Sequence, residues 1–364
     1  MQAGDAGKVS LRQLMVLLCL SRMFTVMTYT PEIPLASYGG PSLWSILLSG
    51  VLQMGMLTLG IRLSKSPTGV SPMILGQRGG TFLYRLLGSA YWLLSMGVCL
   101  YTTVSFTYFI VSNFYDFAYW WVVILCLTLA AGVALRQGLE ALCRSAAVMG
   151  VLLLGILALA VVGLADQLSW LNLSWPRLTP LQEGMEIYRG FAMNFEMAAF
   201  LLLLPWVRQY QVPQGRRWIV WTTLLSMAVQ LLLELAAGSD ALDKRFPLFA
   251  LVTTTRFVVL SRLDSVFMGI WVILGFYKLT VFLQLAVSLF AAMGYRPVLH
   301  RDIWVHAGLV AVLALVALGY SGLRSALYAA VGAGALTVLG VVVLPLVGWV
   351  LTRKEKADCD KEKS

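Results

Sequence analysis

Four ionisable residues lie inside long apolar stretches of this sequence: Arg22, Glu196, Glu234 and Lys278. A charged side chain at membrane depth is unfavourable by several kcal/mol, so it is usually kept there for pairing, ligand binding or conduction. Two of the four are positive and two are negative, and they could neutralise one another inside a helical bundle. We therefore predict an intramembrane charge network of these residues. The alternative interpretation is structural ion pairing, or side chains that extend to the membrane surface.

Glu196 is the strongest candidate for binding a ligand. It follows Asn194 and Phe195 in a stretch that also contains Gly190, so polar groups and a helix breaker share one apolar run. A carboxylate in such a place could receive an ammonium group or hold water. The sequence therefore predicts a polar site around this segment.

The sequence lacks the usual motifs of catalysis and metal binding. It has no H-E-x-x-H, no G-x-S-x-G and no glycine-rich phosphate loop, and it contains two histidines. Its five cysteines show no C-x-x-C spacing. We expect a protein that is not an enzyme and that holds neither a metal nor a cofactor.

The elements that carry these residues are apolar segments of membrane-spanning length. The chain is 59% hydrophobic and 12% charged, whereas soluble domains have about 25% charged residues. A helix needs about 20 apolar residues to cross the hydrocarbon layer of a membrane. We predict ten spans, at residues 11–30, 42–61, 86–111, 118–134, 146–165, 187–206, 218–238, 266–293, 303–320 and 327–351.

The positive charges predict the orientation of these spans. An even number of spans puts both termini on one side, and most of the 27 Lys and Arg residues fall on that side, which indicates cytoplasmic termini. The net charge of +10 is then a topology signal, and we expect no nucleic-acid partner. Residues 352–364 form a charged cytoplasmic tail that is expected to touch anionic membrane lipid.

The ten spans divide into two equal sets. We predict a single transmembrane domain, residues 1–364, with a first five-helix repeat at 10–165 and a second at 186–351. Because five is odd, the two halves would have opposite orientations, as in inverted-repeat transporters. In that architecture helices one and six are interrupted near the midplane. The predicted fold class is an all-α membrane protein of about ten helices with a 5+5 inverted repeat.

Several motifs together resemble a known family. They are Leu11-Arg12-Gln13-Leu14, a G-x-E-x-x-x-R motif from Gly138 to Arg144, the run from Gly190 to Pro205, Phe246-Pro247-Leu248, and Arg262-Leu263-Asp264 with Trp271, Phe276 and Lys278 downstream. The chain resembles, over essentially its whole length, the B subunit of bacterial spore-germination receptors. These form the spore germination permease family, within the amino acid, polyamine and organocation transporter superfamily. A difference lies in span one, where Phe24-Thr25-Val26 stands at the point where many members have a glycine pair.

The resemblance implies a membrane subunit that binds a small germinant, typically an amino acid, and signals germination. Its partners would be the larger A subunit and the lipoprotein C subunit of a germinant receptor, in the spore inner membrane or the bacterial cell membrane. The expected ligand-binding residues are Thr25, Val26, Met27, Tyr101, Asn194, Phe195, Glu196 and Phe276. A proton-coupled amino acid or polyamine permease is the alternative function. A third is a scaffold or water-conducting subunit whose pocket is vestigial.

Overall fold

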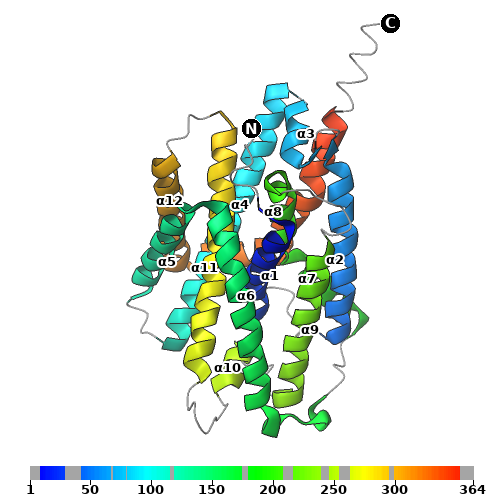
Figure 1. Ribbon diagram of the computed structural model, residues 1–364, viewed down its shortest axis with the longest axis vertical. Helices are drawn as coiled ribbons and strands as arrows, with labels where there is room; N and C mark the ends of the chain where they lie inside the picture. The colour runs from blue at the N-terminus through cyan, green and yellow to red at the C-terminus, as the bar shows by residue number, and fades with distance from the viewer. Residues whose placement is uncertain are drawn as a thin grey trace, which may run out of the picture.

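The computed structural model describes residues 9–28, 42–66, 69–78, 80–114, 119–173, 179–207, 216–238, 246–253, 263–294 and 299–352. Within these ranges the chain is a bundle whose long helices run roughly parallel or antiparallel to one axis (Figure 1). A short antiparallel hairpin pairs β1 (Lys65–Ser66) with β2 (Gly69–Val70). The fold class is all-α.

The helical elements follow one another along the chain as follows: α1 (Leu11–Met27), α2 (Leu43–Leu63), α3 (Pro72–Arg78), α4 (Gly80–Phe114), α5 (Trp120–Leu135), α6 (Gly138–Gly163), η2 (Ala165–Gln167), η3 (Trp170–Asn172), α7 (Pro180–Ala192), α8 (Glu196–Leu203), η4 (Leu204–Trp206), α9 (Arg217–Ala237), α10 (Pro247–Thr253), α11 (Leu263–Ala292), α12 (Leu299–Gly319), α13 (Ser321–Gly332), α14 (Ala335–Val338) and the π-helical segment η7 (Leu339–Val343). Residues 344–352 continue as a helix.

Most of the predicted spans are long apolar helices. In the described part of the chain, eight helical segments are long and apolar enough to cross a membrane. The predicted spans 11–30 and 118–134 correspond to shorter helices, α1 with 17 residues and α5 with 16. The protein is therefore a multi-pass membrane protein, and the count of ten spans and the internal repeat stay predictions.

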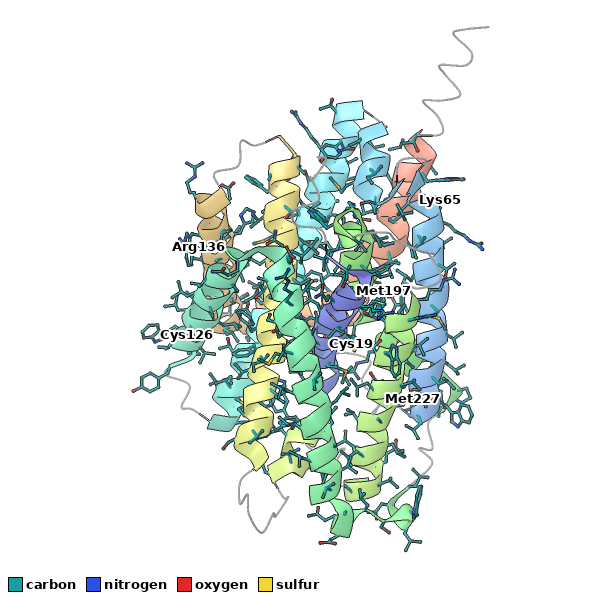
Figure 2. All side chains as sticks on the ribbon, in the orientation of Figure 1. Cys19, Lys65, Cys126, Arg136, Met197 and Met227 are labelled. Carbon is teal, nitrogen blue, oxygen red and sulfur yellow. The ribbon has the colours of Figure 1, made fainter. Side chains whose placement is uncertain are left out.

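The outer faces of the bundle are apolar. On α5 the exposed residues Leu125, Leu129 and Val133 recur every four positions, so they form one stripe. On α6 Val151 is 71% exposed. Figure 2 shows side chains of this kind extending outward from the helices. A surface of this composition suits contact with lipid tails rather than water.

Helix α1 is the central element of the bundle. It packs against α6, α9, α11 and α8, and Figure 1 shows it enclosed by its neighbours. Its residues Leu14, Leu17, Leu18 and Met23 are buried in the apolar core. The polar residues Ser21, Arg22 and Thr25 of α1 are buried as well, so they face other helices.

The sixth predicted span is interrupted. Helix α7 ends at Ala192 and α8 begins at Glu196, which leaves Met193, Asn194 and Phe195 outside both helices. The preceding helix starts at Pro180, earlier than the predicted residue 187, because Thr179 and Gln182 form a capping box there. The expected break in this span is present in the structure.

The first predicted span is not interrupted where the break was expected. Helix α1 is regular from Leu11 to Met27 and passes through Phe24, Thr25 and Val26 without a gap. This stretch has no glycine or proline to end the helix, and residues 29 and 30 of the predicted span lie outside the described residues. The expected interruption of helix one is therefore absent from the described part of this span, residues 11–28.

The last predicted span, 327–351, is also not one continuous helix. It is divided by Ala333 and Gly334 between α13 and α14, and Gly334 has a φ of +69°, which favours glycine. A Cβ at this position would lie 2.7 Å from the hydroxyl of Tyr188 and 2.9 Å from Cβ of Ala192. The turn thus lets the tenth span approach the broken sixth span closely.

Candidate ligand-binding site

Three polar side chains of α1 point toward the break in the sixth span: Ser21, Arg22 and Thr25. Thr25 is four positions from Ser21 and three from Arg22, and residues three and four positions apart are neighbours on a helix surface. All three are buried, and Arg22 is 8% exposed. The central helix therefore presents two hydroxyl groups and one guanidinium group to its neighbours.

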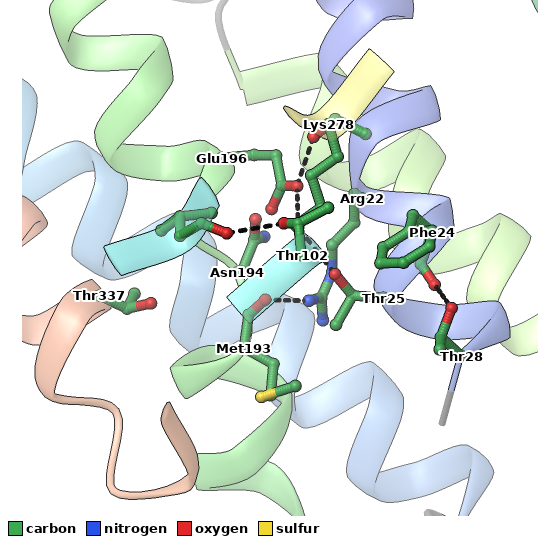
Figure 3. A network of polar contacts seen from close by, with 12 residues as sticks. Arg22, Phe24, Thr25, Thr28, Thr102, Met193, Asn194, Glu196, Lys278 and Thr337 are labelled. Atoms are coloured by element: carbon green, nitrogen blue, oxygen red, sulfur yellow. Dashed lines mark hydrogen bonds and ion pairs between the residues drawn. The ribbon is translucent and has the colours of Figure 1, made fainter. Parts of the chain in front are cut away.

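A buried ion pair lies at the start of α8. The Lys278 ammonium on α11 donates to Glu196 Oε1 at 2.6 Å and to Thr25 Oγ1 at 2.8 Å (Figure 3). The Ser21 hydroxyl donates to the same Glu196 oxygen at 2.7 Å. The side chains of both ions are 0% exposed. One carboxylate oxygen therefore connects α1, α8 and α11.

Arg22 caps the other side of the break. Its Nη1 donates to the carbonyl of Met193 at 2.5 Å and its Nη2 to that of Gly190 at 3.0 Å, as Figure 3 shows for Met193. These carbonyls belong to the C-terminal end of α7, where the helix dipole is negative, whereas Glu196 stands at the positive N-terminal end of α8. Both charges therefore favour the interrupted conformation.

Side chains of two further helices complete the break. Gln53 on α2 donates to the Gly190 carbonyl at 3.1 Å and accepts from the Asn194 amide at 2.7 Å. Thr337 on α14 donates to the Ala192 carbonyl at 2.5 Å. The backbone carbonyls that the interruption frees are thus satisfied by side chains from α1, α2 and α14, as buried polar groups require.

Two acceptor atoms at the break have no partner among the described residues. They are Glu196 Oε2 and Asn194 Oδ1, both fully buried. A buried acceptor that lacks a hydrogen bond is unfavourable by about 1–3 kcal/mol. Both atoms only accept hydrogen bonds, provided that Glu196 is ionised, so they suit a donor such as an ammonium group or water.

Aromatic rings border the ion pair. The Lys278 ammonium lies 5.0 Å from the ring centre of Phe195, within the range of a cation–π interaction. Tyr101 on α4 packs edge-on against Phe195, with ring centres 5.6 Å apart. The structure therefore brings together five of the expected ligand-binding residues: Thr25, Tyr101, Asn194, Phe195 and Glu196.

Val26 and Met27 belong to the apolar packing around α1. Met27 is buried in the core and Val26 packs against that core while partly exposed. Neither offers a polar group to the break. Their expected role in ligand binding stays a prediction.

Phe276 lies away from the charged centre. It lines an open lateral groove of about 650 Å³ between α4, α5 and α11, together with Phe106, Cys126 and Val272. Residues two apart on a helix point in nearly opposite directions, so Phe276 faces outward when Lys278 faces inward. Phe276 was expected to bind the ligand together with Glu196. In the structure it lines the lateral groove instead.

Glu234 has a hydrogen-bond partner on its own helix. Its carboxylate accepts from Gln230 Nε2 at 3.0 Å, one turn earlier on α9. The adjacent Leu235 carbonyl accepts from the backbone of Ser169 and the side chain of Asn172, in the connection between α6 and α7. Glu234 thus lies at the end of its helix, beside a connecting segment. In the described part of the chain Lys278 and Glu196 form an ion pair and Arg22 binds the same break, whereas the place of Glu234 in the network stays a prediction.

Sequence reasoning missed three residues of this site: Ser21, Gln53 and Thr337. A signal was available for Gln53, since it is a lone amide inside the apolar run 42–61. Ser21 and Thr337 carry no comparable signal, because hydroxyl side chains are common in membrane helices, where they bond to the preceding turn. Metal binding has no support in the described residues, where no three His, Cys, Asp or Glu side chains form a suitable group.

The G-x-E-x-x-x-R motif has a structural explanation apart from this site. Gly138 has a φ of +82° and begins α6, and a positive φ is readily adopted only by glycine. Arg144 pairs with Glu140, one turn earlier on α6, at 2.6 Å, and their side chains are 69% and 38% exposed. The motif therefore specifies a tight turn and a surface ion pair. Arg262 of the other charged motif lies outside the described residues.

The fold and the site define a class of protein: a multi-pass helical membrane protein with a broken helix and buried charges at its centre. Sequence comparison then gives the family. The model of the spore germination protein family matches residues 8–316, so the chain belongs to that family. No curated protein matches the chain.

Proposed function

We propose that this protein is the membrane subunit of a spore germinant receptor, and that it binds an α-amino acid at the break between α7 and α8. The observation that carries the proposal is the pair of buried acceptors, Glu196 Oε2 and Asn194 Oδ1, which lack partners among the described residues. Each of these oxygens can accept a hydrogen bond from an ammonium group. Membership of the spore germination protein family supports the same function.

The charges around the break favour a ligand that also carries a carboxylate. Arg22 and Lys278 are positive and Glu196 is negative, so the centre has an excess positive charge when all three groups are ionised. Arg22 uses two of its five N–H donors on carbonyls. A ligand carboxylate near Arg22 would balance the excess charge at the low dielectric of the bundle. This supports a zwitterionic amino acid over a polyamine.

In the proposed receptor, ligand binding shifts the bundle between two arrangements. By the family resemblance, a large A subunit and a lipoprotein C subunit receive that signal in the spore inner membrane. The Lys and Arg distribution supports cytoplasmic termini. A proton-coupled amino acid or polyamine permease is the second candidate, favoured by Glu196 Oε2 as an oxygen that can take up a proton.

The test is binding of amino acids to the purified protein in lipid nanodiscs. A panel of L- and D-amino acids is screened by thermal unfolding, since a ligand at about 100 times its Kd stabilises the native state by about 2.7 kcal/mol. Glu196→Gln should then weaken binding of the active amino acid about 10- to 100-fold, the value of a charge-assisted hydrogen bond. Glu234→Gln makes the same change at a buried acid outside the site and should leave binding unchanged.

The two candidate functions are separated by transport. The protein in proteoliposomes should bind the active amino acid without accumulating it when a proton gradient is imposed. Gradient-driven accumulation would establish the permease instead. Spores that carry Glu196→Gln should respond less to the same amino acid, and unchanged binding by this variant would place the ligand elsewhere.

A further inference from the structure

The Lys278 ammonium occupies a closed, fully buried cage. Its walls are the Glu196 carboxylate at 2.6 Å, the Thr25 hydroxyl at 2.8 Å and the Phe195 ring, whose centre lies 5.0 Å away. A second ring, that of Phe282, lies 5.9 Å from the same nitrogen. A carboxylate, a hydroxyl acceptor and ring faces are the groups that bind a primary ammonium ion from any source.

The groups that form the cage are held in place by α1 and α8, independently of Lys278. Glu196 is fixed at the start of α8, and the Ser21 hydroxyl holds its Oε1 at 2.7 Å. Thr25 comes from the continuous helix α1. Lysine, in contrast, reaches the cage on a flexible four-carbon stem. The binding groups should therefore keep their positions better than the group they bind.

We propose that the position of Lys278 Nζ is an ammonium-binding site in its own right, and that the chain fills it with a tethered lysine. When the stem is removed, a free primary alkylammonium ion takes the same place. A ligand amine that exchanged with Lys278 would release α11 from α1 and α8. That last link to germination rests on the proposed function, whereas the site itself does not.

The test is rescue of Lys278→Ala by free amines. This change removes Cγ, Cδ, Cε and Nζ, which together have the size and shape of n-propylammonium. The variant in nanodiscs should unfold roughly 5–10 °C below the wild type, since one partner of a buried pair is left alone. Added n-propylammonium should recover at least half of that loss, in a saturable manner.

The controls separate the site from salt and from general effects of amines. Tetramethylammonium at the same ionic strength carries no N–H donor and should recover nothing, and n-hexylammonium should recover less because it is too long. The double variant Lys278→Ala/Glu196→Gln should lose the rescue. Lys65→Ala, at an exposed lysine of β1 (Figure 2), should not respond to any amine.

The rescue experiment has results that support the ammonium site and results that contradict it. Equal recovery by tetramethylammonium, or no recovery in a folded Lys278→Ala protein, overturns it. If this variant does not fold alone, it is purified in the constant presence of n-propylammonium or of tetramethylammonium. Folded protein with the first ion and not with the second supports the site, and equal results contradict it. Because no germinant is used, failure here leaves the proposed receptor function standing, and failure of amino-acid binding leaves this site standing.

Discussion

Helix α1 and the α7–α8 segment occupy equivalent places in the two predicted five-helix halves, yet they differ in construction. Helix α1 is continuous from Leu11 to Met27 and offers side-chain groups. The other segment is broken between Ala192 and Glu196 and offers backbone carbonyls. Ser21 donates to Glu196, and Arg22 donates to free carbonyls of the second segment. The Thr25 hydroxyl accepts from Lys278, which also donates to Glu196. One helix therefore supplies mainly donors and the other mainly acceptors.

This difference explains why only one of the two needs to be broken. A broken helix exposes carbonyls that are unfavourable in a membrane unless a neighbour donates to them. The intact helix α1 donates to two of these carbonyls through the guanidinium group of Arg22. Two broken helices would compete for the same donors. The predicted inverted repeat would make α1 and the α7–α8 segment alike. At this site they differ, and the donors of α1 match the acceptors of the broken segment.

The largest expected effect comes from dividing the ion pair that joins the two segments. Glu196→Gln should destabilise the protein by roughly 3–5 kcal/mol, because it leaves the Lys278 ammonium buried without its counter-ion. Glu196→Gln/Lys278→Met should recover most of that loss, because the double change removes both charges. The free energy of unfolding in nanodiscs or in a detergent titration measures both values. Glu234→Gln is the matched control and should change stability much less.

The double variant also separates structure from function. If it is stable but no longer binds the active amino acid, the pair acts on the ligand as well as on the fold. If the double variant is as unstable as Glu196→Gln, the two residues do not act as a pair, and the joint centre between α1 and α8 is disproved.

The sequence was sufficient to predict much of this site, for physical reasons. Long apolar runs with isolated charges require helices in a membrane, so Arg22, Glu196 and Lys278 could be placed on their spans. The break in the sixth span was visible as a glycine and two polar residues in an apolar run. The identity of the partners was not visible. Pairing depends on the position and rotation of each helix. Glu234 is a glutamate like Glu196 but lies near the C-terminal end of α9, whereas Glu196 lies at the start of α8 inside the bundle.

The break in the tenth span was missed for a different reason. Residues 331–335 read Val-Gly-Ala-Gly-Ala, which is apolar throughout and does not lower the hydropathy of the span. Glycine is favoured there by a positive φ and by close contacts with Tyr188 and Ala192 on α7, which are distant in sequence. A hydropathy pattern cannot detect a turn whose cause is a neighbouring helix.

The next effect in size tests the donor side of the comparison. Arg22→Met should destabilise the protein by roughly 2–4 kcal/mol, because the carbonyls of Gly190 and Met193 each lose the hydrogen bond that the guanidinium group donates. Arg22→Lys should recover part of the loss, since an ammonium group keeps the charge but not the planar fork. Thermal unfolding of both variants measures the difference. Arg12→Met, at an exposed arginine on the same helix, is the control, and an equal loss there would contradict a specific cap.

The smallest effect comes from the turn that brings the tenth span to the acceptor side. Gly334→Ala should destabilise the protein by about 1–3 kcal/mol, because a side chain at a φ of +69° is strained and its Cβ would meet Tyr188 and Ala192. Gly308→Ala, in the middle of α12 with open space around it, should be neutral or slightly stabilising. Tyr188→Phe combined with Gly334→Ala should recover only part of the loss, because it removes the hydroxyl contact and leaves the strain. Full recovery would show that crowding alone, and not the left-handed turn, requires glycine between α13 and α14.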